Sequence, residues 1–105
     1  YRPVLKAAKE RNIGVIAMKA VAKGPYPDER TRNCWYQPFT TKVEINEAVR
    51  FTLSQDVTTA ASSSDLEIAK LTIDSALEFT PMTEDEINNL LEKAKAYTPL
   101  FPRGN

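Results

Sequence analysis

Histidine is absent from the 105 residues of this chain, and cysteine occurs only once, at Cys34. Without histidine, the chain lacks the commonest general acid or base and the commonest metal ligand. A single cysteine excludes an internal disulfide and a metal site built from several thiolates. It also has no histidine to activate it as a nucleophile. We therefore expect neither a catalytic residue nor a metal site in this chain, and a lone thiol fits the reducing cytoplasm.

The chain also lacks an excess of either charge and any long apolar run. Its 14 basic and 14 acidic side chains are mixed along the sequence, so nothing indicates nucleic-acid binding. No apolar stretch approaches the ~18–20 residues needed to span a bilayer, and the first residues show no signal-peptide pattern. We therefore expect neither nucleic acid nor membrane as a partner. Because position 1 is not methionine, we expect the chain to begin inside a longer protein.

The first third of the chain contains an amphipathic segment followed by an apolar one. Pro3 suits the first turn of a helix, and the apolar spacing predicts that helix over 3–12. The nearly continuous apolar run that follows predicts a strand over about 13–19, buried on both faces. Residues 22–42 show no sustained periodicity and are expected to form a long loop, which serves either as a lid over a ligand or as an anchored connection.

The second half of the chain also predicts a helix followed by a strand. Helical spacing predicts a helix over 43–55, with an expected stripe of Ile45, Ala48, Val49, Thr52 and Leu53 on one face. A β-prone run predicts a strand over about 57–61. Helices are also predicted over about 66–79 and about 84–97. The expected buried stripe of the first of these is Leu66, Ala69, Ile73, Ala76 and Leu77. The last helix opens with the capping-box spacing of Thr83 and Glu86, and its expected stripe is Ile87, Leu90, Leu91 and Ala94.

A strand, a crossover helix and a second strand predict parallel pairing, hence an α/β protein. Two strands buried on both faces need partner strands, which this chain does not supply. A (β/α)8 barrel typically takes ~250 residues. The pattern therefore predicts a fragment of a (β/α)8 TIM barrel with two parallel strands and flanking helices.

In parallel α/β folds, ligands bind beyond the carboxyl ends of the strands. Two segments lie there, namely Met18, Lys19 and Ala20 after the first strand, and Ser62, Ser63, Ser64 and Asp65 after the second. The amides and hydroxyls of the second segment can bind an anion such as a phosphate at a helix amino terminus. The same residues can instead cap the helix, which the local sequence favours, since the Asp65 carboxylate competes with an anion for the amides. Lys19 is either a ligand-binding lysine or a charge at the barrel mouth.

Three stretches of the chain resemble the aldo-keto reductase family. KAAKERNIGVIAMKA at 6–20 resembles the helix and seventh strand of that barrel, and AVRFTLSQDVTTA at 48–60 resembles the next helix and the eighth strand. FTPMTEDE at 79–86 resembles the family's closing segment. The resemblance spans most of the chain, and it implies that the chain is the C-terminal portion of such a barrel.

The resemblance implies an NAD(P)H-dependent reductase of small aldehydes or ketones. The family's catalytic aspartate, tyrosine, lysine and histidine lie upstream, so the resemblance implies that this chain alone is inactive. Met18 takes the place of an aromatic residue that stacks on the nicotinamide, and Lys19 that of a serine near the cofactor phosphates. Ser62, Ser63, Ser64 and Asp65 fall on the loop that holds the adenosine phosphate.

The chain departs from the family pattern on that loop. Ser62 stands where many members have a lysine, and Ile68 stands near the position of an arginine that pairs with the 2′-phosphate of NADP. Both NADP and NAD therefore remain candidate cofactors. Two other interpretations stay open, namely a non-catalytic, self-associating interaction module derived from a barrel, and another (β/α)8 enzyme family with the same order of elements.

Overall fold

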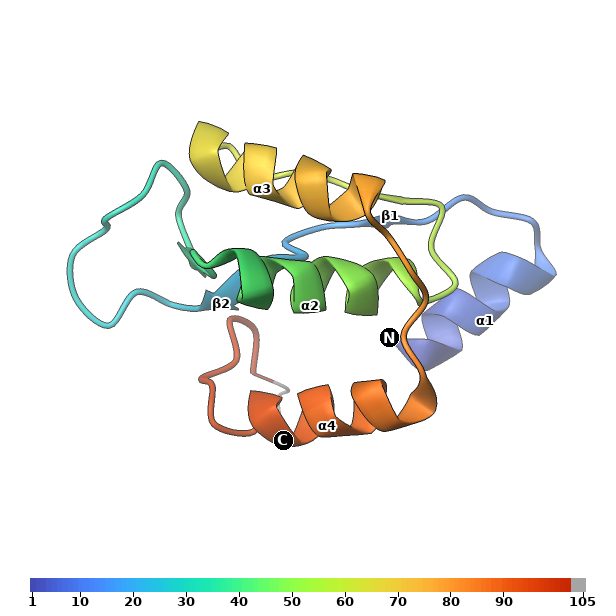
Figure 1. The fold of residues 1–105 in the computed structure, drawn as a ribbon. Coiled ribbons are helices and arrows are strands. Elements are labelled where there is room, and N and C mark those ends of the chain that lie inside the picture. Colours follow the sequence, from blue (N-terminus) through green and yellow to red (C-terminus); the bar gives the residue numbers. More distant parts are fainter. Residues whose placement is uncertain (103–105) are drawn as a thin grey trace.

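The computed structural model describes residues 1–102, which form a mixed α/β arrangement (Figure 1). The elements in chain order are α1 (Arg2–Glu10), β1 (Ile16–Ala17), β2 (Ala22–Gly24), β3 (Gln37–Pro38), α2 (Lys42–Leu53), β4 (Thr59–Ala60), α3 (Leu66–Leu77) and α4 (Glu84–Ala94). Figure 1 shows α2 between α3 and α4, with α1 at one end of the molecule and the β2–β3 connection at the other.

β1 and β4 form the expected parallel pair. Ile16 lies opposite Thr59 and Ala17 opposite Ala60, and α2 connects the two strands. This confirms the predicted parallel pairing in an α/β chain. Both strands are shorter than predicted, because only these residues exchange regular ladder bonds.

The prediction that the first strand is buried on both faces is wrong for residues 1–102. Val15 and Ala17 are half-buried, and they line an apolar groove together with Leu5 of α1 and other residues of α1 and α2. Ile16, on the opposite face, is 66% exposed, and Met18, which borders the same groove just after the strand, is 70% exposed. The physical reason is that the helices cover one side of this strand, and the described part of the chain supplies no second layer for the other.

The predicted loop over 22–42 contains a small antiparallel sheet. β2 pairs with β3, with Ala22 opposite Pro38 and Gly24 opposite Gln37. Gly24 is required here, because a Cβ at this position would lie 2.6 Å from the carbonyl oxygen of Thr98. A hydrogen bond joins two parts of the β2–β3 connection, because the Tyr26 hydroxyl donates to the carbonyl oxygen of Cys34 at 3.1 Å. The segment is thus anchored at its base.

The hydrophobic core lies between α2 and α3. It consists of Val21, Ile45, Val49 and Ile68, with Phe39, Ala48, Leu53 and Leu71 packed around it. The buried stripe predicted for α2 is confirmed, since Ile45 and Val49 are buried. The side chain of Thr41 accepts the backbone N–H of Glu44 and begins the helix as an N-cap.

The stripe predicted for α3 is wrong. Leu66 and Leu77 are more than four-fifths exposed and Ile73 is 54% exposed, whereas the buried side chains are Ile68, Thr72 and Ser75. Small side chains let α3 pack closely against α2, and the Thr72 hydroxyl is satisfied within the helix by the carbonyl oxygen of Ile68 at 2.7 Å. Close packing therefore outweighs burial of the larger leucines in this chain.

α4 begins with the predicted capping box between Thr83 and Glu86. It has no buried residue, so its predicted stripe is at most half-buried, and Leu91 is 40% exposed. Polar contacts hold the helix to α2. The guanidinium of Arg50 donates to both carboxylate oxygens of Glu86, at 2.8 and 3.1 Å, and also to the carbonyl oxygens of Thr80 and Pro81.

Candidate functional site

The parallel pairing places the segments after β1 and β4 at the same edge of the sheet. The β2–β3 connection extends from this end of the molecule, beside the start of α3 (Figure 1). Two kinds of contact form there. Arg32 and Asn33 of the connection bind the segment 62–65, and Lys19 contacts aromatic rings.

Asp65 occupies the amino terminus of α3. Its Oδ1 accepts the backbone N–H of Ile68 at 3.2 Å, and its Oδ2 accepts the backbone N–H of Asn33 at 3.1 Å. The backbone N–H of Asn33, followed by that of Ile68, holds the pKa of Asp65 below its ordinary value. The residue is only 7% exposed. It therefore serves as an ionised N-cap and joins the β2–β3 connection to α3.

The three serines beside it differ in their surroundings. Ser63 is buried and its hydroxyl accepts the backbone N–H of Asp65 at 3.2 Å. The Ser64 hydroxyl donates to the carbonyl oxygen of Asn33 at 2.6 Å. Ser62 is exposed. The hydroxyls of Ser63 and Ser64 thus bond within the described chain, as in the capping interpretation, and Ser62 and Ser64 are both exposed.

Sequence reasoning missed Arg32, which comes from the β2–β3 connection. Its Nη1 contacts the carboxylate of Glu67 and lies 3.8 Å from that of Asp65. Glu67 is the main reason that the pKa of Arg32 is raised. No local pattern marks this residue. It lies in a segment without periodicity, and its partners lie more than 30 positions away in the sequence. A cation from the β2–β3 connection therefore lies beside the segment 62–65, whose own residues are three serines and an aspartate.

A second arginine, Arg30, supports Arg32 from the same connection. Its Nε donates to the carbonyl oxygen of Arg32 at 2.9 Å, and its Nη2 donates to Oδ1 of Asn33 at 3.3 Å. The amino end of α3 is thus bordered by two guanidinium groups and by the carboxylates of Asp65 and Glu67.

Lys19 follows β1 and has a left-handed backbone, with φ of 61°. Such a conformation is uncommon for a residue with a side chain. The ammonium lies 5.3 Å from the ring centroid of Trp35 and 5.2 Å from that of Phe101, at cation–π distance. Met18 beside it is exposed and Ala20 is half-buried. Within residues 1–102, no hydrogen bond or ion pair joins residues 18–20 to the segment 62–65.

The two aromatic residues of the β2–β3 connection next to Cys34 have different environments. Tyr36 is buried, and burial raises the pKa of its phenol. Trp35 is 58% exposed and stacks edge-on against Tyr36, with a centroid distance of 5.7 Å. Tyr36 therefore anchors the connection, while Trp35 presents an aromatic surface beside Lys19.

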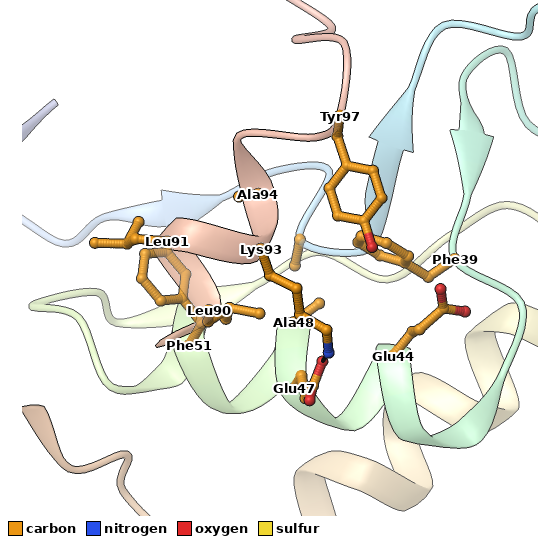
Figure 2. Close-up of a pocket in the computed structure, with 11 residues that line it drawn as sticks. Phe39, Glu44, Glu47, Ala48, Phe51, Leu90, Leu91, Lys93, Ala94 and Tyr97 are labelled. Atoms are coloured by element: carbon orange, nitrogen blue, oxygen red, sulfur yellow. Dashed lines mark hydrogen bonds and ion pairs between the residues drawn. The ribbon is translucent and has the colours of Figure 1, made fainter. Parts of the chain in front are cut away.

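A separate apolar groove of about 160 Å³ lies between α2 and α4 (Figure 2). Phe39, Phe51 and Tyr97 supply its aromatic walls, and Phe39 and Tyr97 contact each other edge to face at 5.5 Å. An ion pair between Lys93 and Glu47, 2.6 Å long, borders it. None of the predicted cofactor-binding residues except Ala20 lines this groove.

Over residues 1–102, none of the helices has both the length and the apolar character needed to cross a membrane. In the same range, no three histidine, cysteine or acidic side chains are grouped so that they could hold a metal ion.

No protein-family model, curated protein or solved structure matches this chain.

Proposed function

We propose that this chain is the C-terminal, cofactor-contacting part of a (β/α)8 barrel of the aldo-keto reductase kind. The parent enzyme reduces small aldehydes or ketones with a nicotinamide cofactor in the cytoplasm, and its catalytic residues lie upstream of this chain. The observation that carries the proposal is the parallel pairing of β1 with β4. It places residues 18–20 and 62–65 at the edge of the sheet where barrel enzymes bind ligands.

The surroundings of β1 support the barrel. In a closed barrel, helices cover the outer face of each strand, and side chains from other strands pack against the inner face. Here Val15 and Ala17 border a groove that residues of α1 and α2 also line, while Ile16 is exposed on the other side of the strand. A further groove of about 610 Å³ runs between α1 and the segment that includes Ile16. An adjacent βα unit would fill these spaces.

The site supports cofactor contact through two features. Ser62 is exposed at the start of the loop before α3, within the segment that the family resemblance assigns to the adenosine end of the cofactor. Lys19 and Trp35 offer a cation and an exposed ring after β1. A dinucleotide carries phosphates and flat rings, which such groups bind.

Cofactor binding by the purified chain tests this proposal. Trp35 is the single tryptophan and lies beside Lys19, so its emission reports on the site. We expect saturable quenching on titration with NADH or NADPH. Lys19→Ala should weaken binding, whereas Lys6→Ala, which removes an exposed lysine of α1, should not. Absence of saturable quenching, or equal effects of the two substitutions, would contradict cofactor contact by these residues.

The barrel assignment has its own test in the messenger RNA that encodes the chain. The region upstream of Tyr1 should encode six further βα units. A tyrosine, a lysine–aspartate pair and a histidine should lie on separate strands among them. An upstream sequence without these units and residues would contradict the reductase assignment.

The exposed apolar surface favours a second candidate, a non-catalytic module that associates with its own copies. Ile16 of β1 and Met18 just after it are exposed, and so are Leu66, Ile73 and Leu77 on α3. Exposed strand edges and apolar patches promote association. A chain that self-associates but gives no saturable response to either cofactor would favour this candidate over the first.

A further inference from the structure

The groove between α2 and α4 stays open because polar contacts hold the two helices together (Figure 2). Arg50 of α2 binds Glu86 at 2.8 Å, and Lys93 of α4 binds Glu47 at 2.6 Å. None of the residues of α4 is buried, so its apolar side does not close against α2. The two helices therefore leave an unfilled space of about 160 Å³ between them.

The walls of this groove suit one aromatic ring. Phe51 of α2 and Leu90 and Leu91 of α4 lie at one end, and Phe39 and Tyr97 lie at the other (Figure 2). In another protein, an apolar cavity of about 150 Å³ binds a single benzene molecule. The groove thus has room for a ring with a short chain, but not for a ligand as large as a dinucleotide.

The charged side chains of the groove leave one carboxylate in excess. Glu44, Glu47 and Lys93 all line the groove, and Lys93 is paired with Glu47. Glu44 accepts the hydroxyl of Thr41 at 2.7 Å, and within residues 1–102 no lysine or arginine forms an ion pair with its carboxylate. A carboxylate can accept several hydrogen bonds, so it has capacity for a further donor. A cation is therefore attracted to this groove, whereas an anion is repelled.

Aromatic rings at the same end add to this preference. Figure 2 shows the Glu44 carboxylate at the end of the groove where Phe39 and Tyr97 lie. The rings of Phe39 and Tyr97 contact each other edge to face at 5.5 Å, and Lys23, which lines a separate cavity, lies 5.6 Å from the centroid of the Tyr97 ring. Because the face of an aromatic ring attracts an ammonium group, the rings and the carboxylate favour the same kind of ligand.

We propose that this groove binds a small organic ammonium ion that carries one aromatic ring on a short chain. The ring of the ligand packs against Phe51, Leu90 and Leu91, and its ammonium group faces Glu44. Among the predicted cofactor-binding residues, only Ala20 lines the groove. The inference therefore does not rest on the proposed function, and a cofactor titration that fails would leave it standing.

Nuclear magnetic resonance titrations of the isotope-labelled chain with three probes test the proposal. The probes are 2-phenylethylammonium, 2-phenylethanol and phenylacetate, which are similar in size and carry a positive, a neutral and a negative end. We expect saturable shifts of the backbone amides in 44–51 and 90–97 with the ammonium. It should bind about fivefold more tightly than the alcohol, as expected of one partly exposed charge pair, and phenylacetate should bind more weakly than the alcohol.

Two substitutions separate the charge of the groove from its space. Glu44→Gln should abolish the preference for the ammonium over the alcohol, and glutamine suits this position in the first turn of α2 as glutamate does. Glu92→Gln makes the same change of charge where Glu92 pairs with Lys95, and should leave the preference unchanged. Ala94→Phe fills the groove and should weaken binding of both probes by about tenfold, whereas Ala76→Phe on the exposed side of α3 should not.

A preference for the ammonium that is confined to the groove and lost in Glu44→Gln would support the proposal. The proposal is overturned if the amides of 44–51 and 90–97 show no saturable shifts, or if the alcohol or phenylacetate binds as tightly as the ammonium. A preference that persists unchanged in Glu44→Gln would overturn the role of this carboxylate. Circular dichroism should show equal helix content in all variants, so that a loss of binding is not a loss of folding.

Discussion

At the scale of single residues, Asp65 links two distant parts of the chain. It caps α3 through Ile68 and holds Asn33 of the β2–β3 connection. An N-cap contributes about 0.5–2 kcal/mol to protein stability, and asparagine caps a helix about as well as aspartate. We therefore expect Asp65→Ala to lower the free energy of unfolding by about 1–2 kcal/mol and Asp65→Asn to lower it clearly less.

Urea denaturation followed by circular dichroism measures both variants of Asp65. Ser62→Ala is the control, because Ser62 is exposed in the same loop and should leave stability nearly unchanged. An alanine variant as stable as the unmodified chain would show that this cap does not hold α3 and the connection together.

Glu86 is the residue from which a pH dependence follows. Its bidentate contact with Arg50, and then the backbone N–H of Thr83, hold its pKa at about 2 instead of the ordinary 4.5. The lowered pKa means that the folded state favours the ionised form. The contribution is therefore fully present above about pH 4.5 and is lost as the pH falls through about 2.

We expect Glu86→Gln to have a lower melting temperature than the unmodified chain at pH 6, and the gap to close toward pH 2. Glu92→Gln should show a small gap at every pH, because the Glu92 pair with Lys95 is exposed and exposed pairs contribute little. A gap for Glu86→Gln that stays constant from pH 6 to pH 2 would contradict the role of its charge.

At the scale of elements, the orientation of α3 is the feature most open to test. Ile68 is fully buried against the α2 core, while Leu66 is 87% exposed two positions earlier. Replacing a buried isoleucine by alanine costs about 2–5 kcal/mol. We expect Ile68→Ala to lower the free energy of unfolding by an amount in that range, and Leu66→Ala to change it by less than about 0.5 kcal/mol. Chemical denaturation measures both, and a loss for Leu66→Ala as large as that for Ile68→Ala would contradict this orientation of α3.

The helices α2 and α3 differ in whether the local sequence predicts the face that is buried. The face of α2 is predicted correctly because most of its apolar residues lie on the side of Ile45 and Val49, with Val43 exposed. α3 carries large apolar residues on one side and Ile68, Leu71, Thr72 and Ser75 on another, and hydrophobicity alone favours the wrong one. The position of Asp65 and the fit of small side chains against α2 decide the outcome, and both depend on tertiary contacts.

At the scale of the whole molecule, the exposed side of β1 governs behaviour in solution. Ile16 of β1 and Met18 just after it are exposed, and the outer edge of β1 is unpaired in the described part of the chain. We expect the chain to self-associate with rising concentration, and Ile16→Lys to reduce this, since charged residues on strand edges oppose pairing. Sedimentation velocity over a concentration series measures it.

Val43→Lys is the matched control for this association. Val43 is 68% exposed on α2, so a lysine there adds the same charge away from the strand. If the unmodified chain sediments as a monomer throughout, or if Val43→Lys reduces association as much as Ile16→Lys, the exposed side of β1 is not the associating surface.

Part of the candidate site is predictable from the sequence, and part depends on tertiary contacts. The segments 18–20 and 62–65 follow predicted strands, so the sequence places them at one edge once the strands pair in parallel. Arg32 and Glu67 are invisible to that reasoning. They become a site only because the β2–β3 connection folds back onto the start of α3, across more than 30 residues of chain.

The sequence by itself determined the order of the four helices and of β1 and β4, the caps at Asp65 and Thr83, and the parallel pairing of β1 with β4. These depend on contacts within a few residues and on the rule that a crossover helix joins parallel strands. Only the tertiary structure decided which face of α3 is buried, that β2 and β3 pair within the long connection, and that one side of β1 stays exposed. These features depend on which distant surfaces meet, and burial is a property of the assembled chain rather than of any local segment.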